Sequence, residues 1–258
     1  MPAKKTAPPD PARSLALLWG SHTKPGRSGL TVRAIVRAAI ELADASGLEA
    51  VSMRLVAEQL KVGTMSLYTH VPGKGELTDL MFDTVYGDLY ADADEPLRQP
   101  GGWRGALEFI AHRNFDLLTQ HPWIHEVPGG RNALGPNITL KYEAELRPLD
   151  GIGLTDVEMD STLTLVLTHV LGTSRAGAEQ LRNQQESGMS DEEWWLTTSP
   201  VLERYMAGVA DRFPLAGRVG TSAGEHYNAT MDPAHALEFG LTRILDGTAL
   251  LIAERSKT

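Results

Sequence analysis

Cysteine is absent from this chain of 258 residues. Its absence excludes disulfide bonds, thiolate metal ligands and a cysteine nucleophile, and it is compatible with a reducing compartment. Long apolar runs are missing as well. The run nearest the N-terminus, Leu15–Trp19, is shorter than the roughly 7–15 residues of a signal-peptide core, and no later segment approaches the ~20 apolar residues of a membrane helix. We therefore expect a soluble, cytoplasmic protein that has no membrane partner.

The sequence also contains little that indicates catalysis or metal binding. It has no glycine-rich phosphate loop, no GxSxG elbow and no HExxH motif. His121 and His125 are spaced like two metal ligands on one helix face, but Pro122 lies between them. We expect no metal and no other cofactor. An all-α enzyme is kept as an alternative, because the C-terminal half contains several His, Asp and aromatic residues.

The charge is distributed unevenly along the chain. The net charge is -9, but residues 1–74 contain ten Lys or Arg and five Asp or Glu, a net charge of +5 that leaves -14 for the remainder. A basic N-terminal part on an acidic body suits a module that contacts phosphate. Because a solvated basic face would have the same composition, this asymmetry alone does not establish nucleic-acid binding.

Apolar residues recur at steps of three and four from Thr31 onward, the pattern of amphipathic helices, and no strand alternation interrupts them. This periodicity predicts an all-α fold. The spacing places Ser52 before a short helix and Thr64 as the cap of a second one over residues 65–71. Ser190 and Glu193 have the spacing of a capping box, and Pro200 is expected to open a separate helix. The last helix is expected over residues 233–254.

The pattern divides the chain into three parts. Residues 1–29, rich in Pro, Ala, Gly, Ser, Lys and Arg, are expected to form a flexible basic arm. Residues 30–90 contain three short helices and a longer one from about residue 74, which is expected to join the domains. After a linker with two prolines and paired glycines, residues 101–258 are expected to form a larger helical domain.

Three helices with a short break between the second and third match the geometry of a helix-turn-helix. The specific evidence is in the residues: IVRAAIELA from Ile35, GLEAVSMRLVA from Gly47, and LYxHV from Leu67 followed three residues later by Lys74. This stretch closely resembles the DNA-binding domain of the TetR (tetracycline-repressor) family. The resemblance covers Leu30 to about Tyr90. The downstream half is similar to tetracycline-repressor-type C-terminal domains only in helix order and in its final amphipathic helix.

The resemblance implies a repressor that binds a palindromic operator as a homodimer and is released by a small-molecule effector. It places the start of the second short helix against base edges, whereas tyrosine, histidine and lysine near its end contact phosphates. The implied DNA-contact residues are Arg54, Thr64, Met65, Ser66, Tyr68, Thr69, His70 and Lys74. The implied core of the helix-turn-helix consists of Leu55, Val56, Leu60, Val62, Leu67 and Val71. Packing is the alternative role for the tyrosine and histidine, and Arg54 could instead pair with Glu58, four residues on.

Residues 64–69 contain no Arg, Lys, Asn or Gln, the side chains that make the strongest bidentate contacts to bases. This departs from many relatives in the family. We expect thymine-methyl contacts by Met65 or Thr64, a contact by Arg54, and minor-groove contacts by Lys24 and Arg27 to replace them.

Aromatic and histidine side chains in the second domain are candidates for an effector pocket, since ligand cavities are mostly apolar with a few polar groups. The candidates are Trp103, His112, Phe115, Trp123, His125, His169, Trp194 and Trp195. The alternative for each of them is a position in the core. A constitutive DNA-binding protein without an effector is the alternative for the whole chain.

The final helix is expected to form the dimer together with the helix around residues 163–181. Its apolar stripe is about four turns long, and Gly240 and Gly247 would let a neighbouring helix approach closely. The predicted dimerisation residues are Leu237, Leu241, Ile244, Leu245, Thr248 and Leu251. The alternative is that this helix packs inside its own subunit.

Overall fold

The structure, a computed structural model, describes residues 11–20, 30–127 and 134–255. Within these ranges the chain forms α-helices and short 3₁₀ helices and no strand, which confirms the predicted all-α class. None of the helices in this part of the chain combines the length and apolar character that a membrane crossing requires.

The described chain packs into two compact units. The first comprises the residues up to Thr164 together with Ile252–Arg255, and the second comprises Leu165–Leu251. Helices α8 (Asp156–Ser187) and α11 (Pro233–Arg255) contribute residues to both units.

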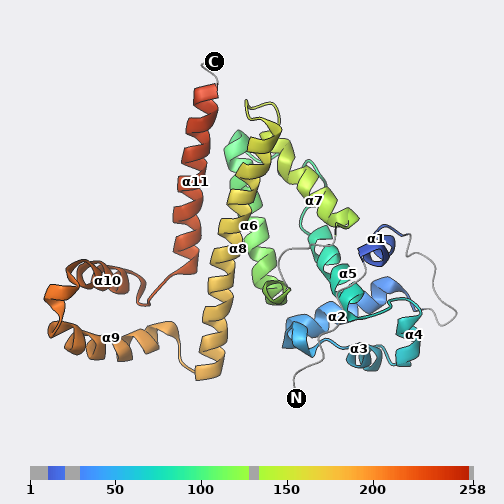
Figure 1. The fold of residues 1–258 in the computed structure, drawn as a ribbon, viewed down its shortest axis with the longest axis horizontal. Coiled ribbons are helices and arrows are strands. Elements are labelled where there is room, and N and C mark those ends of the chain that lie inside the picture. Colours follow the sequence, from blue (N-terminus) through green and yellow to red (C-terminus); the bar gives the residue numbers. More distant parts are fainter. Residues whose placement is uncertain (1–10, 21–29, 128–133, 256–258) are drawn as a thin grey trace. The chain divides into compact units, whose positions relative to one another are not determined.

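The helix-turn-helix region begins the first unit after the N-terminal segment (Figure 1). It consists of α2 (Val32–Ser46), the 3₁₀ helix η1 (Leu48–Ala50), α3 (Met53–Gln59) and α4 (Thr64–Tyr68). Side-chain caps start the first and third of these elements: Thr31 accepts the N–H of Ala34, and Ser52 accepts the N–H of Leu55.

A Schellman-type turn ends α3. The N–H of Val62 donates to the carbonyl of Ala57 and the N–H of Lys61 donates to that of Glu58. Lys61 has a φ of 54°, the left-handed region that this turn requires and that glycine usually occupies. The turn reverses the chain so that α3 and α4 pack against each other.

The bounds predicted for α4 are wrong at both ends. Gly63 precedes the helix as the N-cap residue and Thr64 is already helical, so no side chain caps this end. The helix ends at Tyr68 instead of residue 71, because the N–H groups of His70 and Val71 both turn back to the carbonyl of Leu67.

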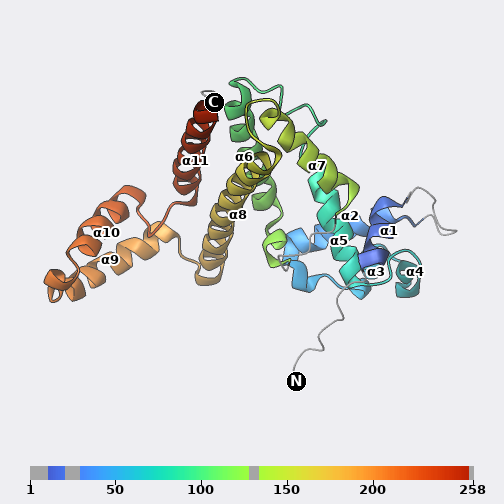
Figure 2. The same ribbon diagram turned by 45° about the horizontal axis from the view of Figure 1, so that its top comes forward.

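Helix α1 (Pro11–Trp19) lies within the segment predicted to be a flexible arm, so that prediction is wrong for these residues. Leu18 is buried and the hydroxyl of Ser14 donates to Asp79 Oδ2 at 2.6 Å. The indole N–H of Trp19 donates to the carbonyl of Leu134 at 2.8 Å. Figure 2 shows α1 beside α5 (Lys74–Gly87), the helix that carries Asp79. The rest of the predicted arm, including Lys24 and Arg27, lies outside the described residues.

Helices α5, α6 (Gly102–Gln120) and α7 (Pro136–Leu146) surround a buried carboxylate. Glu145 is completely buried and accepts hydrogen bonds from the Tyr90 hydroxyl and the Asn114 amide, both at 2.8 Å. Its other oxygen accepts the ammonium of Lys141 at 2.6 Å. Burial, together with the negative charge of Glu145, raises the pKa of Tyr86 to about 12. The negative charge of Glu145 is compensated by Lys141 and by the hydrogen bonds from Tyr90 and Asn114, so its burial does not leave an unpaired charge in the core. The cluster instead fixes how the three helices cross.

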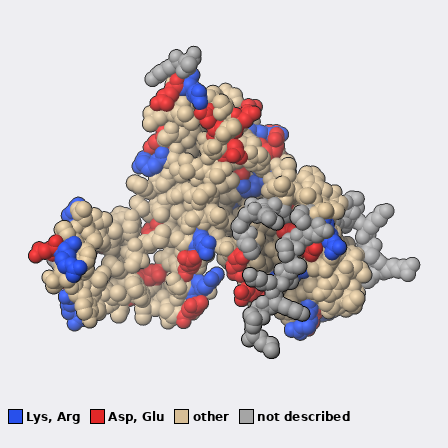
Figure 3. Space-filling view, viewed as in Figure 1, with Lys and Arg blue, Asp and Glu red and all other residues tan. Residues whose placement is uncertain are grey.

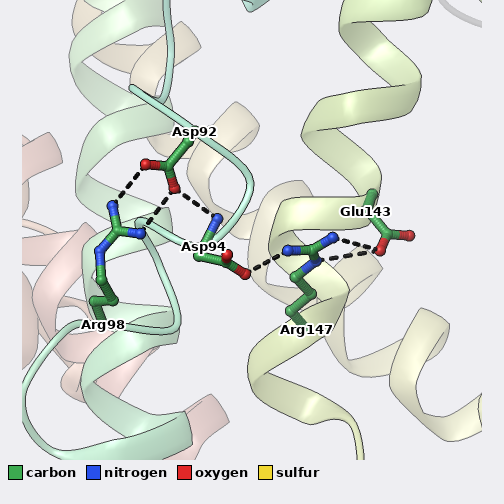
Figure 4. A network of polar contacts seen from close by, with 5 residues as sticks. All are labelled: Asp92, Asp94, Arg98, Glu143 and Arg147. Atoms are coloured by element: carbon green, nitrogen blue, oxygen red, sulfur yellow. Dashed lines mark hydrogen bonds and ion pairs between the residues drawn. The ribbon is translucent and has the colours of Figure 1, made fainter.

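The segment between α5 and α6 is folded against α7 (Figure 4). Arg98 makes two 2.9 Å hydrogen bonds to Asp92. Arg147, in the 3₁₀ helix η3 (Arg147–Leu149) that follows α7, bridges Asp94 and Glu143. Each exposed ion pair contributes little by itself. The Arg98 pair lies within the predicted linker, and the contact of Arg147 with Asp94 attaches this linker to the end of α7.

The second unit contains the later part of α8, α9 (Asp191–Ala207), the 3₁₀ helix η4 (Ala210–Arg212), α10 (Pro214–Tyr227) and most of α11. The capping box of Ser190 and Glu193 is confirmed. The predicted break at Pro200 is wrong, because α9 continues through this proline. Helix α10 was not predicted from the sequence, because its three glycines weaken its helical signal.

Asp83, on α5, caps the N-terminus of α7 from another part of the chain. Its Oδ1 accepts the N–H of Asn137 at 3.2 Å and that of Ile138 at 3.1 Å. A side chain at Gly135 would place its Cβ 2.2 Å from Oδ1, so this close approach requires glycine. Burial raises the pKa of Asp83, and the hydrogen bonds to residues 137 and 138 oppose this rise.

We predict that Asp83→Ala lowers the free energy of unfolding by about 0.5–2 kcal/mol, the usual cost of losing a helix cap. Asp83→Asn keeps the acceptor and should cost less. Because the folded-state pKa is raised, ionisation of Asp83 opposes folding. Its favourable contribution is present below the unfolded pKa of about 3.9 and is lost as the pH rises through the folded value. Chemical denaturation from acid to neutral pH should therefore show the Asn variant gaining stability relative to wild type, and a constant difference would contradict this assignment.

Candidate nucleic-acid interface

Helix α4 has an inner and an outer side. Leu67 is completely buried on the inner side, whereas Met65 is 76% and Tyr68 44% exposed on the outer side. Thr69 is also exposed and its hydroxyl donates to the carbonyl of Ser66. The remaining predicted contact residues of this segment, Thr64, Ser66 and His70, are half-buried. The outer side therefore presents an uncharged thioether and a phenol to solvent.

The predicted core of the helix-turn-helix divides into two groups. Val56, Leu67 and Val71 are completely buried. Leu55, Leu60 and Val62 are half-buried around them. The buried group joins α3, α4 and the segment after it, and so fixes the angle at which α4 is presented.

The structure pairs Arg54 with Glu58. The two side chains meet at 2.6 Å on the exposed side of α3, which is the alternative interpretation of this arginine. The Arg54 side chain is 71% exposed, and an exposed pair at this spacing is worth only about 0.3–0.5 kcal/mol. Arg54 can therefore exchange this partner for another anion at low cost.

The ammonium group of Lys74 is used inside the protein. It donates to the carbonyl of Leu48 at 3.0 Å, and the lysine is half-buried. The N–H of Leu48 donates to Glu126 Oε2 at 3.1 Å, in the 3₁₀ helix η2 (Pro122–Glu126) that follows α6. Gly47 has a φ of 79°, and a Cβ there would lie 3.3 Å from the Glu126 carboxylate. The backbone N–H and carbonyl of Leu48, which belong to consecutive peptide groups, thus join η2 and the start of α5 to the segment that follows α2.

Asp44, near the end of α2, provides a second contact to η2. Its Oδ1 accepts the indole N–H of Trp123 and faces His121 Nδ1, both at 2.7 Å. Trp123 is completely buried. No local sequence pattern could have predicted these contacts, because the partners are 77 and 79 residues apart.

The eight candidate pocket residues do not share one environment. Trp103, His112, Phe115, Trp123 and His125 lie in the first unit, and His169, Trp194 and Trp195 lie in the second. His169 Nε2 is 3.0 Å from the carbonyl of Leu237, and the ring of Trp195 packs against Gly224. With the Asp44 contact of Trp123, these contacts favour the core interpretation for three of the eight. Among the described residues, no three or more His, Cys, Asp or Glu side chains converge to hold a metal ion.

The predicted dimerisation stripe of α11 faces the interior of the subunit. Leu237, Leu241, Leu245 and Thr248 are buried in the single chain, and Ile244 and Leu251 are half-buried. Gly240 accommodates the ring of His169, from which a Cβ would be only 2.3 Å away, whereas no atom approaches the corresponding position at Gly247. The opposite side of α11 exposes Phe239 (59%) and Leu250 (68%). Four of the six residues therefore have little surface left for a partner.

Comparison with known proteins agrees with these features. Residues 29–80 match the family model described as "Bacterial regulatory proteins, tetR family", and residues 95–252 match "Tetracyclin repressor-like, C-terminal domain". The HTH-type transcriptional repressor DrrR1 of Streptomyces coeruleorubidus is 39% identical over 249 residues, which cover 95% of this chain and 88% of that protein.

Solved structures are similar along most of the chain. Apo ActR from Streptomyces coelicolor is 26% identical with a TM-score of 0.67, and the match covers 91% of this chain and 99% of ActR. ActR in complex with actinorhodin is 26% identical with a TM-score of 0.62 and covers 84% of this chain and 94% of that one. With both family models matched, and with the helix-turn-helix and its exposed α4 in place, the chain belongs to the TetR family of bacterial transcriptional regulators.

Proposed function

We propose that this regulator is a cytoplasmic repressor that binds a palindromic operator as a homodimer and is released by a small-molecule effector. The observation that carries the proposal is the outer side of α4, where Met65 and Tyr68 are exposed on a rigidly packed helix-turn-helix. Side chains in this position enter the major groove in helix-turn-helix proteins.

The composition of α4 favours contacts with thymine methyl groups. Met65 offers a flexible apolar side chain, and the segment 64–69 has no side chain that makes a bidentate contact to a base. Tyr68 adds a hydroxyl within reach of the backbone of a bound duplex. We infer that Met65 contributes to sequence preference and Tyr68 to affinity for any sequence.

We predict that Met65→Ala changes the preferred operator sequence, with about 1–3 kcal/mol lost at a site that uses this contact. Tyr68→Phe should weaken binding to all duplexes by a similar factor, because it removes only a phosphate-directed hydroxyl. Both residues are exposed, so the free energy of unfolding should not change. Fluorescence anisotropy with a selected operator and with shuffled duplexes measures the effect, and Leu97→Ala, an exposed apolar change outside the domain, is the control. Unchanged operator binding in both α4 variants would refute the proposed DNA contact.

A homodimer supplies the two α4 helices that a palindrome requires. We propose that the dimer uses the exposed side of α11, because the predicted stripe is largely buried within the subunit. On the exposed side, Arg243 lies over the ring of Phe239 at 5.5 Å and pairs with Asp246, and Leu250 is one further turn along. The later part of α8 adds exposed Leu165 and Leu171. Leu196, Tyr205 and Leu215 are exposed on α9 and α10, where Figure 3 shows charged groups gathered at the left edge beside a tan surface.

The combined substitution Phe239→Asp with Leu250→Asp should convert the dimer to monomers, because it places charge in an apolar interface but not in the subunit core. Analytical ultracentrifugation measures the mass, and circular dichroism checks that the helices persist. The matched control is Leu97→Asp with Leu140→Asp, two exposed leucines of the first unit. If the α11 variant stays dimeric, this side of the helix is not the interface.

We propose that the effector is a planar aromatic compound that binds in the C-terminal domain. The support is the ligand of the related ActR and two aromatic side chains of α6 that have no described internal bond, Trp103 and Phe115. The physical link to DNA is η2, which contacts α2 through Asp44 and η1 through Leu48. A ligand that shifts α6 would move η2, and with it the orientation of the helix-turn-helix. Half-sites about 34 Å apart tolerate little change in the separation of two α4 helices.

Thermodynamic linkage makes the coupling reciprocal. If the effector weakens operator binding by a given factor, operator DNA must weaken effector binding by the same factor, which is typically about 5–150-fold. Actinorhodin is the first probe, followed by compounds from a thermal-shift screen of planar aromatics. Asp44→Ala removes the acceptor of the Trp123 indole N–H without changing the buried ring, so we predict that it lowers this factor while ligand binding to the free protein is retained. Equal ligand affinity for free and operator-bound wild type, across the screen, would favour a constitutive DNA-binding protein instead.

A further inference from the structure

Basic residues of the helix-turn-helix fall into two classes. Arg54 pairs with Glu58, and Lys74 donates to the carbonyl of Leu48. The side chains of Arg33, Arg37 and Lys61 are exposed and make no hydrogen bond or ion pair with any described residue. Of the cations that the sequence marks for DNA contact, Lys74 is therefore engaged inside the protein and Arg54 is paired at the surface, whereas Arg33, Arg37 and Lys61 remain available.

Two of the available cations line a groove beside α2. This open groove has a volume of about 390 Å³ and is bordered by Arg33 and Arg37 on α2 and by Gln59 and Leu60 at the end of α3. Residues four apart lie on the same side of a helix, so both guanidinium groups are presented together. Leu60 begins the turn that leads into α4, which places the groove next to the proposed reading helix along the chain.

Arg37 makes no ion pair with the nearest acidic residue on α2. Glu41 is four residues after Arg37, a spacing at which an ion pair is common. Its Oε2 instead accepts the amide of Gln59 at 2.7 Å, across the groove from α2 to α3. Two like charges at this spacing cost about 0.2–0.5 kcal/mol in an isolated helix. The arrangement thus leaves two positive charges unneutralised at one end of the groove and a carboxylate at the other.

We propose that this groove, with Arg33 and Arg37, binds a phosphate of the DNA backbone that flanks the base pairs contacted by α4. Guanidinium groups suit this partner because their donors match phosphate oxygens in a bidentate arrangement. The phosphate lies at the Arg33 and Arg37 end, away from Glu41. These contacts position the helix-turn-helix on the duplex without reading sequence. The inference rests on the proposed operator binding and adds an anchor outside α4.

The test is the dependence of DNA affinity on salt. Each phosphate contact that is lost lowers the slope of log K against log salt concentration by about 0.9. Arg33→Ala with Arg37→Ala should therefore lower the slope by about 1 and weaken the operator and an unrelated duplex by the same factor. The doubly conservative variant Arg33→Lys with Arg37→Lys should retain most of the slope. Glu41→Gln should increase affinity for both duplexes, because it removes the carboxylate and keeps an amide that can bond Gln59.

Anisotropy titrations of the full chain between low and physiological salt give all four slopes, and circular dichroism shows whether each variant is folded. An Ala variant that is folded and keeps the wild-type slope would overturn the groove as a phosphate site. A loss confined to the operator duplex would also overturn it, because it would assign the arginines to base contacts. If wild type itself binds no duplex at any salt concentration, the proposed function fails and not the groove alone.

Discussion

The backbone of Leu48 is the point on which the arrangement of the DNA-binding region depends. Its carbonyl is held by Lys74 at the start of α5, and its N–H is held by Glu126 of η2. Both partners are charged, and hydrogen bonds to charged groups are stronger than those between neutral groups. Asp44 reinforces the same joint by accepting the buried indole N–H of Trp123. A displacement of either α5 or η2 must break a charge-assisted bond or carry the end of α2 with it.

Helix α5 is held at three further points, which makes it a rigid element. Ser14 of α1 contacts Asp79, Asp83 caps α7, and Tyr90, just beyond its end, reaches the buried Glu145. The segment that follows α5 is attached to the end of α7 by the ion pair of Arg147 with Asp94. The first unit therefore has no free hinge between the helix-turn-helix and α7 in the described chain. We therefore expect any movement between the helix-turn-helix and α7 to occur as a shift of packed helices.

The charges of the helix-turn-helix show how context divides similar residues between structure and binding. Lys74 donates a hydrogen bond to the carbonyl of Leu48, and Arg54 forms an exposed ion pair that is broken at little energetic cost. Neither Arg33 nor Arg37 has a side-chain partner among the described residues. The same division occurs on α11, where one apolar side packs within the subunit and the other carries exposed Phe239 and Leu250. In both cases residue type identifies a candidate, and its neighbours decide which role is open to it.

Sequence alone determined the class of fold, the helix-turn-helix and the family, because these depend on local periodicity, capping residues and a contiguous motif from Ile35 to Leu77. Local signals failed where packing overrides them: α1 forms in a Pro- and Ala-rich segment because it docks on α5, and α9 continues through Pro200. Only the tertiary structure decided which side of α11 is buried. It also decided that Trp123 donates to Asp44 and Lys74 to Leu48, and that Glu41 accepts the amide of Gln59. The physical reason is sequence distance. These partners are 18 to 79 residues apart, and no helical or capping pattern extends over such a separation.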